Sequence, residues 1–498
     1  MAEIKKYKTL KGGIKFENFK GQIEGSVVEF PVPERVIIPL KQGFGDEVEP
    51  IVKIGDKVKC GEIIGISEKN ISSPVHASIS GYVRDIIEKN YFGRETKYII
   101  IEGDGKNDEF EKLKYHDKKF EEMSPSEIGE KLYLSGVTSL GRAGIPTKFK
   151  SSFVNPEDIE YLIIHGIGSE IYNVLIDKIL EGKKLFNFVK GIEVLKKLFT
   201  NIKKVYLAIN RYEKKFIEEI SKLTYDFEWL EISLIEPKYP SGYDEVLIPT
   251  LLKKDFPYGY SAANIGVIVL NIRAILYVYE AIFENKPFIE TIIGLGGPSF
   301  KENLHLKVRI GTPIKNVTKE YLKDDKDIRI ILNSLITGEK IDDLDLPIDR
   351  ATNHIIAIKE NKERRFLSFL RPNFRGYSYT NAFLNFVDKY PDTNMHGEKR
   401  PCINCGYCYE VCPVNIIPHL IIKFVMKNIF DERLMEYGIF KCIECNLCSF
   451  VCPSKIPVSH YIKEGQHKLI NIGCDRSQCI LPYFQLKGIE EYRGVKKL

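Results

Sequence analysis

The chain has 498 residues and a formal net charge of +5; 44% of its residues are hydrophobic and 28% are charged. This composition is that of a globular protein with room for three or four domains, and it requires no disulfide framework. The small net charge argues against a uniformly basic nucleic-acid-binding protein. The N-terminus lacks a secretory signal, and the longest uncharged apolar stretch, residues 256–272, is too short and too interrupted to cross a membrane.

The first hundred residues have the pattern of a β-domain. From about residue 20 to 105, short apolar runs are broken by Gly, Pro and Asp, which predicts strands and tight turns. The segments Gly55–Gly65 and Ser73–Val83 are typical of the flattened hairpins of a lipoyl-type sandwich. We therefore expect a β barrel-sandwich domain over residues 1–110, with a structural role for His76.

Strands and helices alternate in the middle of the chain. Tyr161–Ile164 and Val205–Ile209 are short apolar runs of the type found in buried parallel strands, with amphipathic segments between and after them. This pattern predicts a Rossmann-like α/β domain over residues 111–258. Shorter strand candidates around one helix predict a small β-grasp-like (SLBB) α+β domain over residues 259–345. The helical periodicity that follows predicts an α-helical domain over residues 346–498.

Ten of the eleven cysteines lie between Cys402 and Cys479, and eight of them form two copies of the pattern C-x₂-C-x₂-C-x₃-C-P. Bacterial two-cluster ferredoxins use this run to hold [4Fe–4S] clusters, and the fourth cysteine of each run ligates the other cluster. The predicted ligands of cluster one are Cys402, Cys405, Cys408 and Cys452. Those of cluster two are Cys442, Cys445, Cys448 and Cys412.

Zinc is the alternative metal for such cysteines. Structural zinc sites typically use two separated C-x₂-C pairs, not three cysteines at equal spacing and a fourth before proline. Cys474 and Cys479 are expected to be buried thiols, and Cys60 an inert one. Isolated histidines such as His354 and His419 are expected at the surface or in the core.

Short motifs along nearly the whole chain resemble the RnfC subunit of the Rnf complex, a membrane-attached NADH:ferredoxin oxidoreductase. The middle also resembles the flavin-binding subunit of respiratory complex I. Besides the cysteine runs and the two β-segments, the resemblance is carried by Lys11–Ile14, Gly141–Thr147, Tyr239–Gly242 and Arg309–Pro313.

The resemblance implies an FMN and NADH site in the middle domain, at Gly141, Arg142, Gly144 and Glu170. In the family a glycine-rich loop presents backbone N–H groups to the flavin phosphate. Here two of its glycines are Ser139 and Arg142, and Arg142 either pairs with a phosphate or fills its space. Three further elements also depart from the family: Gly168 replaces a glutamate, residues 271–274 read Asn-Ile-Arg-Ala, and a glycine-rich loop near residues 333–338 is hard to find.

These departures predict that flavin and NADH binding is weakened or lost while electron relay through two [4Fe–4S] clusters is kept. The expected protein is a peripheral subunit on the cytoplasmic face of the membrane, part of an Rnf-type NADH:ferredoxin oxidoreductase complex, without catalytic residues of its own. Its expected partners are the other subunits, ferredoxin and NADH. Two alternatives stay open: a soluble carrier resembling the electron-transfer protein of proline reductase, and a scaffold that has lost nucleotide binding.

Overall fold

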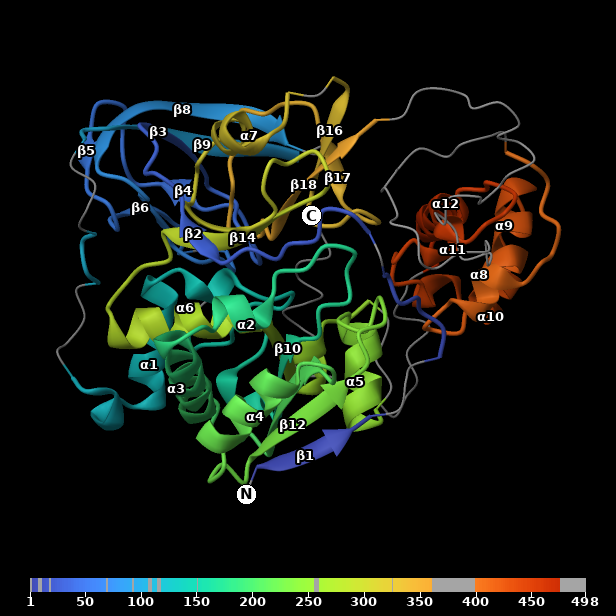
Figure 1. Ribbon diagram of the computed structural model, residues 1–498, viewed down its shortest axis with the longest axis horizontal. Helices are drawn as coiled ribbons and strands as arrows, with labels where there is room; N and C mark the ends of the chain where they lie inside the picture. Colours follow the sequence, from blue (N-terminus) through green and yellow to red (C-terminus); the bar gives the residue numbers. More distant parts are fainter. Residues whose placement is uncertain are drawn as a thin grey trace.

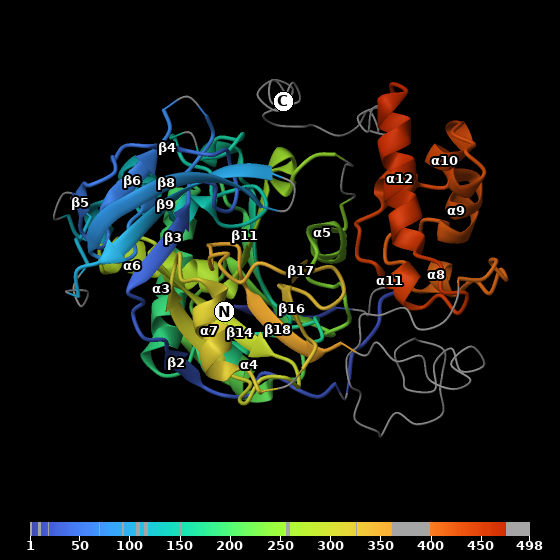
Figure 2. The same ribbon diagram turned by 90° about the horizontal axis from the view of Figure 1, so that it is seen from above.

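The computed structural model describes residues 2–474 except 8–10, 18, 69, 92–93, 106–109, 114–117, 150, 255–258, 325 and 361–398. The strands of the described residues form four sheets, and helices α8 to α12 form a group of their own at one side of the molecule (Figures 1 and 2). The predicted multidomain α/β organisation with a C-terminal helical domain is confirmed.

The β-sandwich domain consists of a four-stranded and a three-stranded antiparallel sheet. The first has the order β3-β9-β8-β5 and the second the order β4-β6-β7. Apolar side chains such as Val36, Ile64 and Ile99 fill the space inside the sandwich. The bounds are Arg35–Pro39 (β3), Glu49–Pro50 (β4), Lys57–Val58 (β5), Ile63–Ile66 (β6), Val75–His76 (β7), Gly81–Tyr91 (β8) and Arg94–Gly103 (β9).

A five-stranded parallel sheet forms the middle of the molecule. Its order is β1-β12-β11-β10-β13, with bounds Glu3–Lys6 (β1), Tyr161–Gly166 (β10), Lys204–Asn210 (β11), Leu230–Ile235 (β12) and Val267–Asn271 (β13). Side chains of successive residues point to opposite faces. Leu162 and Ile164 therefore pack in the core beneath one set of helices, and Ile163 packs with Leu247 of α5 on the other side.

The helices of this layer cover both faces of the parallel sheet. On the larger core lie α1 (Pro125–Leu134), α2 (Ile176–Ile179), α3 (Lys183–Leu198), α4 (Lys214–Leu223) and α6 (Ile272–Phe283). On the other face lies α5 (Asp244–Leu252). The predicted α/β alternation is thus confirmed, because a parallel sheet has to bury both faces.

A six-stranded mixed sheet has the order β17-β16-β18-β14-β15-β2. Its strands are Val27–Glu29 (β2), Glu290–Gly296 (β14), His305–Arg309 (β15), Ile328–Leu332 (β16), Glu339–Ile341 (β17) and His354–Lys359 (β18). Helix α7 (Ile314–Tyr321) contributes Val317 to the core of this domain, beside Leu306 and Ile355.

The helical domain repeats one arrangement at an offset of forty residues. Helices α8 (Tyr407–Glu410) and α9 (Pro418–Met426) recur as α11 (Leu447–Phe450) and α12 (Val458–Asn471), with α10 (Glu432–Glu436) between them. Ile422 of α9 and Ile462 of α12 pack in the shared core. The repeat that is visible in the cysteine runs thus extends to the helices behind them.

The domain boundaries drawn from the sequence differ from the strand pairing in four places. Strand β18, from the predicted helical domain, pairs with β14 and β16. Strand β1, from the predicted sandwich, pairs with β12, and β2 pairs with β15. Strand β13 and helix α6, which fall in the predicted third domain, belong to the parallel sheet, because β13 pairs with β10. Local sequence patterns do not show which distant strand lies alongside a given strand.

In the described part of the chain, no helix is long and apolar enough to span a membrane.

Candidate iron–sulfur centres and the neighbouring nucleotide site

The two cysteine runs adopt the same local backbone. The first two cysteines of each run precede a short helix, the third lies in that helix and the fourth follows it. Asn404 and the equivalent Glu444 both have φ of 55°, and the residue before each helix, Gly406 or Asn446, also has a positive φ. The equal spacing of the cysteines is therefore matched by an equal local fold.

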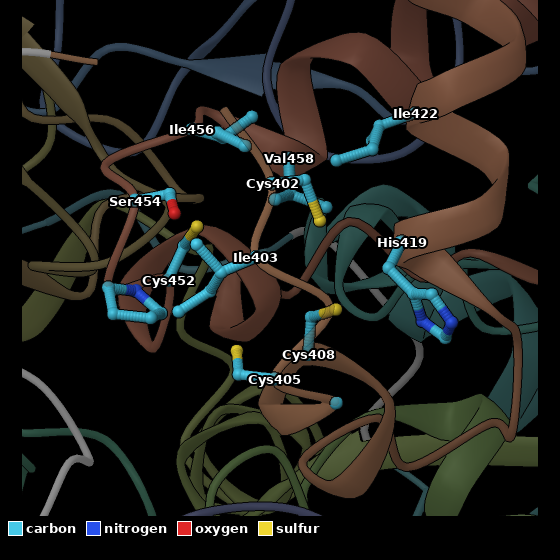
Figure 3. Close-up of a pocket in the computed structure, with 12 residues that line it drawn as sticks. Cys402, Ile403, Cys405, Cys408, His419, Ile422, Cys452, Ser454, Ile456 and Val458 are labelled. Atoms are coloured by element: carbon cyan, nitrogen blue, oxygen red, sulfur yellow. The ribbon is translucent and has the colours of Figure 1, made fainter. Parts of the chain in front are cut away.

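The cysteines of the first centre come from both runs. Cys402, Cys405 and Cys408 of the first run and Cys452 of the second line one small cavity, and their side chains surround a common space (Figure 3). Ile422 and Val458, from the helices α9 and α12, close the same cavity. The structure thus brings together the four thiols that the sequence assigned to cluster one.

The second group is assembled in the same crossed way. Burial raises the pKa of Cys448 well above its ordinary value, and the neighbouring thiols that raise it further include Cys442, Cys445 and Cys412. Cys412 therefore lies with the second run although it belongs to the first. Burial likewise raises the pKa of Cys408 and of Cys445 to about 12.

The donor set fits an iron–sulfur cluster. Buried thiols that are grouped around one space become thiolates only when a strongly positive group compensates their charge, as metal ligation does. Within the described residues, no three His, Cys, Asp or Glu side chains are placed to chelate one metal ion. The thiols of the first centre instead surround a space, which is what a cube of iron and sulfide requires.

The second run packs against the rest of the molecule through Tyr239. This side chain is fully buried, and its hydroxyl donates a hydrogen bond to the carbonyl oxygen of Cys445 at 3.0 Å. It also lies 3.1 Å from the hydroxyl of Tyr243. Ile14, Leu447 and Val451 complete this small core. Tyr239 is not a metal ligand, so the cysteine pattern does not identify it. It is, however, the first residue of the Tyr-Pro-Ser-Gly motif that contributes to the family resemblance.

The Lys-Gly-Gly-Ile motif forms a strap that ties the end of the first run, which carries the Cys412 ligand predicted for cluster two, to the parallel layer. Gly13 donates its backbone N–H to the carbonyl of Val411 at 2.8 Å, and Ile14 pairs with Tyr239 in an isolated β-bridge. Gly12 has φ of 63°, and a Cβ there would lie 2.6 Å from the carbonyl oxygen of Cys412. Both glycines are therefore required by close backbone approach.

The remaining cysteines lie away from both centres. Cys60 is fully buried in the sandwich, where its thiol contacts the carbonyl of Ser78 at 3.2 Å and burial raises its pKa to about 11, in agreement with an inert thiol. Cys474 is partly buried beside the core of the helical domain. Cys479 lies outside the described residues.

Two histidines have clear structural positions. His76 is buried, and its Nε2 lies 2.9 Å from the carbonyl of Leu134, in agreement with the predicted structural role. His419 lines the cavity of the first centre, although the sequence suggested only an isolated residue (Figure 3). Its position follows from α9 packing behind the first run, which local spacing does not reveal.

The glycine-rich loop of the predicted nucleotide site is held by side chains of the protein itself. Gly141 and Gly144 both have positive φ. Arg142 donates to the carboxylate of Glu245 at 3.1 Å, and its guanidinium lies 5.0 Å from the centre of the Tyr243 ring. The structure thus shows Arg142 paired with a carboxylate of the protein itself, an arrangement that the sequence did not suggest.

The second departure in this loop, Ser139, is explained by a distant arginine. The Ser139 hydroxyl accepts a hydrogen bond from Arg350 at 3.3 Å and donates one to the carbonyl of Gly136. The buried Arg350 also donates to the carbonyls of Gly136 and Pro74, at 3.0 and 2.8 Å. Ser139 therefore replaces glycine as part of a hydrogen-bonded support beneath the loop.

Glu170 lies next to the tyrosine pair and not in the glycine-rich loop. Its carboxylate accepts a hydrogen bond from Ser334 at 2.8 Å, and burial raises its pKa to about 7. The loop around Ser334 also contacts the second cysteine run, because Asn446 donates to the carbonyl of Ile336 at 3.0 Å. Gly168, at the position of the missing glutamate, has φ of 64°.

In the third departing element, Asn271 caps α6, and the partly buried Arg273 contacts the domain of the mixed sheet. The Asn271 side chain accepts a hydrogen bond from the Ala274 N–H. The Arg273 guanidinium donates to the carbonyl of Ile292 and to the side chain of Asn353. At the family's third nucleotide-site element the chain thus makes internal structural contacts.

Three family models match the chain in the order of these domains. The RnfC barrel sandwich hybrid domain matches residues 8–106, the Nuo51 FMN-binding domain matches residues 132–280, and a 4Fe–4S dicluster domain matches residues 401–457. Among solved structures, an NAD⁺-reducing [NiFe]-hydrogenase in the H₂-reduced state aligns over 76% of this chain and 67% of its own, at 12% identity and a TM-score of 0.42, which is too distant to support a conclusion.

Similarity to characterised relatives runs along nearly the whole chain. The C subunit of the proton-translocating ferredoxin:NAD(+) oxidoreductase complex of Clostridium ljungdahlii is 27% identical over 92% of this chain and 93% of its own length. The C subunit of the ion-translocating oxidoreductase complex of Buchnera aphidicola is 27% identical, over 93% and 90%. The corresponding protein of Pasteurella multocida is 28% identical over 93% of this chain, which spans about half of that relative. With the three domains in the same order, the chain belongs to the RnfC family, whose members are the C subunits of Rnf-type oxidoreductase complexes.

Proposed function

We propose that this subunit relays single electrons between a nicotinamide or flavin donor on one side and ferredoxin or a membrane-bound partner on the other. The observation that carries the proposal is the crossed grouping of eight thiols, with Cys452 in the first centre and Cys412 in the second. When bound, a [4Fe–4S] cluster supplies reversible one-electron transfer. The crossing joins both runs to both centres, so the two clusters are held side by side.

The protein contributes ligands, burial and orientation. Cys402, Cys405, Cys408 and Cys452 would hold cluster one, and Cys442, Cys445, Cys448 and Cys412 cluster two. Tyr239 holds the second run against the parallel layer, and the Gly12–Gly13 strap holds the end of the first run that carries Cys412. This places cluster two on the side of the nucleotide domain. The parallel sheet would act as the Rossmann-like unit, and the six-stranded mixed sheet as the β-grasp-like unit of the family.

For the nucleotide, we propose binding that is weaker than in relatives with glycine at position 142. The Arg142–Glu245 pair would have to open before a phosphate reaches the backbone N–H groups of the loop. The Arg142 side chain is 54% exposed, so the pair is worth at most about 1 kcal/mol. We propose that the subunit sits at the cytoplasmic face of the membrane through its partner subunits.

Anaerobic purification followed by iron, sulfide and flavin analysis tests these assignments. We expect about eight iron and eight sulfide per chain from two four-iron clusters. Two zinc ions without labile sulfide would contradict the cluster assignment. Stoichiometric, tightly bound FMN would contradict the weakened nucleotide site while leaving the electron relay intact.

A further inference from the structure

The two cysteine runs are nearly identical in sequence and backbone, yet the segment around the second cysteine is exposed in the first run and covered in the second. Cys405 of the first run is exposed, whereas the equivalent Cys445 is buried at 9% exposure. Ile403 is 66% exposed, whereas the equivalent Ile443 packs against the small core around Tyr239. Ile403 therefore offers an exposed apolar contact point directly beside the cysteine ligands of the first centre.

Charge distinguishes the two runs at positions related by the forty-residue repeat. Lys423 of α9 and Lys463 of α12 are equivalent, and each reaches back to the same position of its run. The Lys423 ammonium donates to the neutral Asn404 amide at 2.7 Å. The Lys463 ammonium instead pairs with the Glu444 carboxylate at 3.1 Å. The lysine charge is therefore neutralised beside the second run and kept beside the first.

Two further repeat positions strengthen this difference. Arg400 is exposed before the first run, whereas its equivalent Phe440 is 5% exposed in the core. Lys455 follows Cys452 beside the first centre, where the second centre has Asn415. The backbone N–H of Arg400 donates to the carbonyl of Ser454 at 2.8 Å, which places Arg400 beside Lys455. Glu410, the one carboxylate of the first run, lies beyond Cys408 at the end of α8.

We propose that the Ile403 face, defined by Ile403, Cys405, Arg400, Lys423 and Lys455, docks an acidic electron-carrier protein. This inference rests on the proposed electron relay and adds where the external partner binds. One electron passes between the partner and cluster one: the donor is oxidised by one electron, the cluster is reduced by one, and no bond or proton moves. Electrons then reach the nucleotide domain through the second centre, which contacts that domain through Tyr239 at Cys445 and through the strap at Cys412.

The physics of docking supports an acidic partner. An apolar centre ringed by like charges is the usual arrangement of a contact surface, and opposite charges on the partner accelerate encounter and fix its orientation. Electron transfer falls steeply with distance, so a partner has to approach a cluster closely. Of the two centres, the first has an exposed ligand and an exposed apolar side chain.

The repeat itself supplies matched variants for the test. Lys423→Gln and Lys463→Gln each remove one positive charge at equivalent positions. Asn404→Glu copies the second run into the first and should neutralise Lys423 as Glu444 neutralises Lys463. The probe is a reduced, acidic bacterial two-cluster ferredoxin, mixed anaerobically with the full, cluster-loaded chain in a stopped-flow instrument at low and high salt. Binding of the oxidised probe to the immobilised chain is measured in parallel.

We expect Lys423→Gln and Asn404→Glu to slow cluster reduction at low salt by about threefold or more, with weaker binding and a smaller salt dependence. Lys463→Gln should stay within about twofold of the parent chain. Equal effects of the Lys423 and Lys463 variants, or losses that do not depend on salt, would overturn the assignment of this face. Iron and sulfide are determined for every variant. A parent chain that does not assemble clusters would refute the electron relay itself. That result differs from intact clusters with equal effects of the Lys423 and Lys463 variants, which would refute only the docking face.

Discussion

The Gly12–Gly13 strap offers a direct way to test how the Cys412 end of the first cysteine run is held. Replacing Gly12 by Ala places a Cβ 2.6 Å from the carbonyl oxygen of Cys412 and 2.7 Å from that of Val411. Ordinary contact begins near 3.4 Å, so the strap has to retreat by about 0.8 Å. That movement would stretch the 2.8 Å hydrogen bond from Gly13 to Val411 beyond a useful length.

The expected cost has two parts. An alanine at φ of 63° costs about 1 kcal/mol because its Cβ crowds the backbone. Loss of the Gly13 hydrogen bond adds roughly 0.5–1.5 kcal/mol. A matched control separates the two, because Gly55 also has a positive φ, 94°, and a Cβ there would meet nothing within 4 Å. Gly55→Ala should therefore cost only the conformational part of this free energy, about 1 kcal/mol.

Hydrogen–deuterium exchange of the strap and of the segment 407–412 is the appropriate assay, since a multidomain protein with bound clusters does not unfold in one step. We expect Gly12→Ala to speed exchange there by roughly 10- to 50-fold, from about 1.4 kcal/mol per factor of ten. Iron should also be lost to a chelator at a lower temperature. Unchanged protection of the strap and of 407–412 in Gly12→Ala, or an equal loss in Gly55→Ala, would refute the view that close approach at Gly12 holds the Cys412 end of the first run.

Three further predictions concern the centres and the nucleotide site. Cys412→Ser should remove the electron paramagnetic resonance signal of the cluster on the second run, and a loss confined to the cluster of Cys402, Cys405 and Cys408 would show that the ligands are not crossed. Burial raises the pKa of Glu170 from 4.5 to about 7, so the folded chain holds a proton that the unfolded chain has lost, and stability should fall as pH rises through this window. Glu170→Gln should flatten part of that slope in thermal unfolding between pH 5 and 8, whereas the same change at exposed Glu121 should not. Arg142→Gly should tighten FMN binding by up to about fivefold in fluorescence titration, because the pair with Glu245 no longer has to open; unchanged affinity would show that the pair is not an obstacle.

Much of the fold follows from local patterns. The period of two in the first hundred residues predicted the strands of the sandwich, which the structure contains. The apolar runs at Tyr161–Ile164 and Val205–Ile209 predicted strands that the structure contains as β10 and β11. The cysteine spacing predicted which thiols gather, because ligands three residues apart on a common backbone turn share one side of the chain. These features depend on a few neighbouring residues, so the sequence alone is sufficient for them.

Other features depend on which distant segments come together, and the tertiary structure alone decides them. No local signal places β1 beside β12, joins Ser139 to Arg350 or pairs Arg142 with Glu245. The two cysteine runs are the sharpest example, since their sequences predict equal surroundings. Packing of Tyr239 against the second run covers Cys445, while Cys405 of the first run stays exposed. Burial is a property of the whole chain arrangement, and so two near-identical motifs acquire different environments only after the domains have packed.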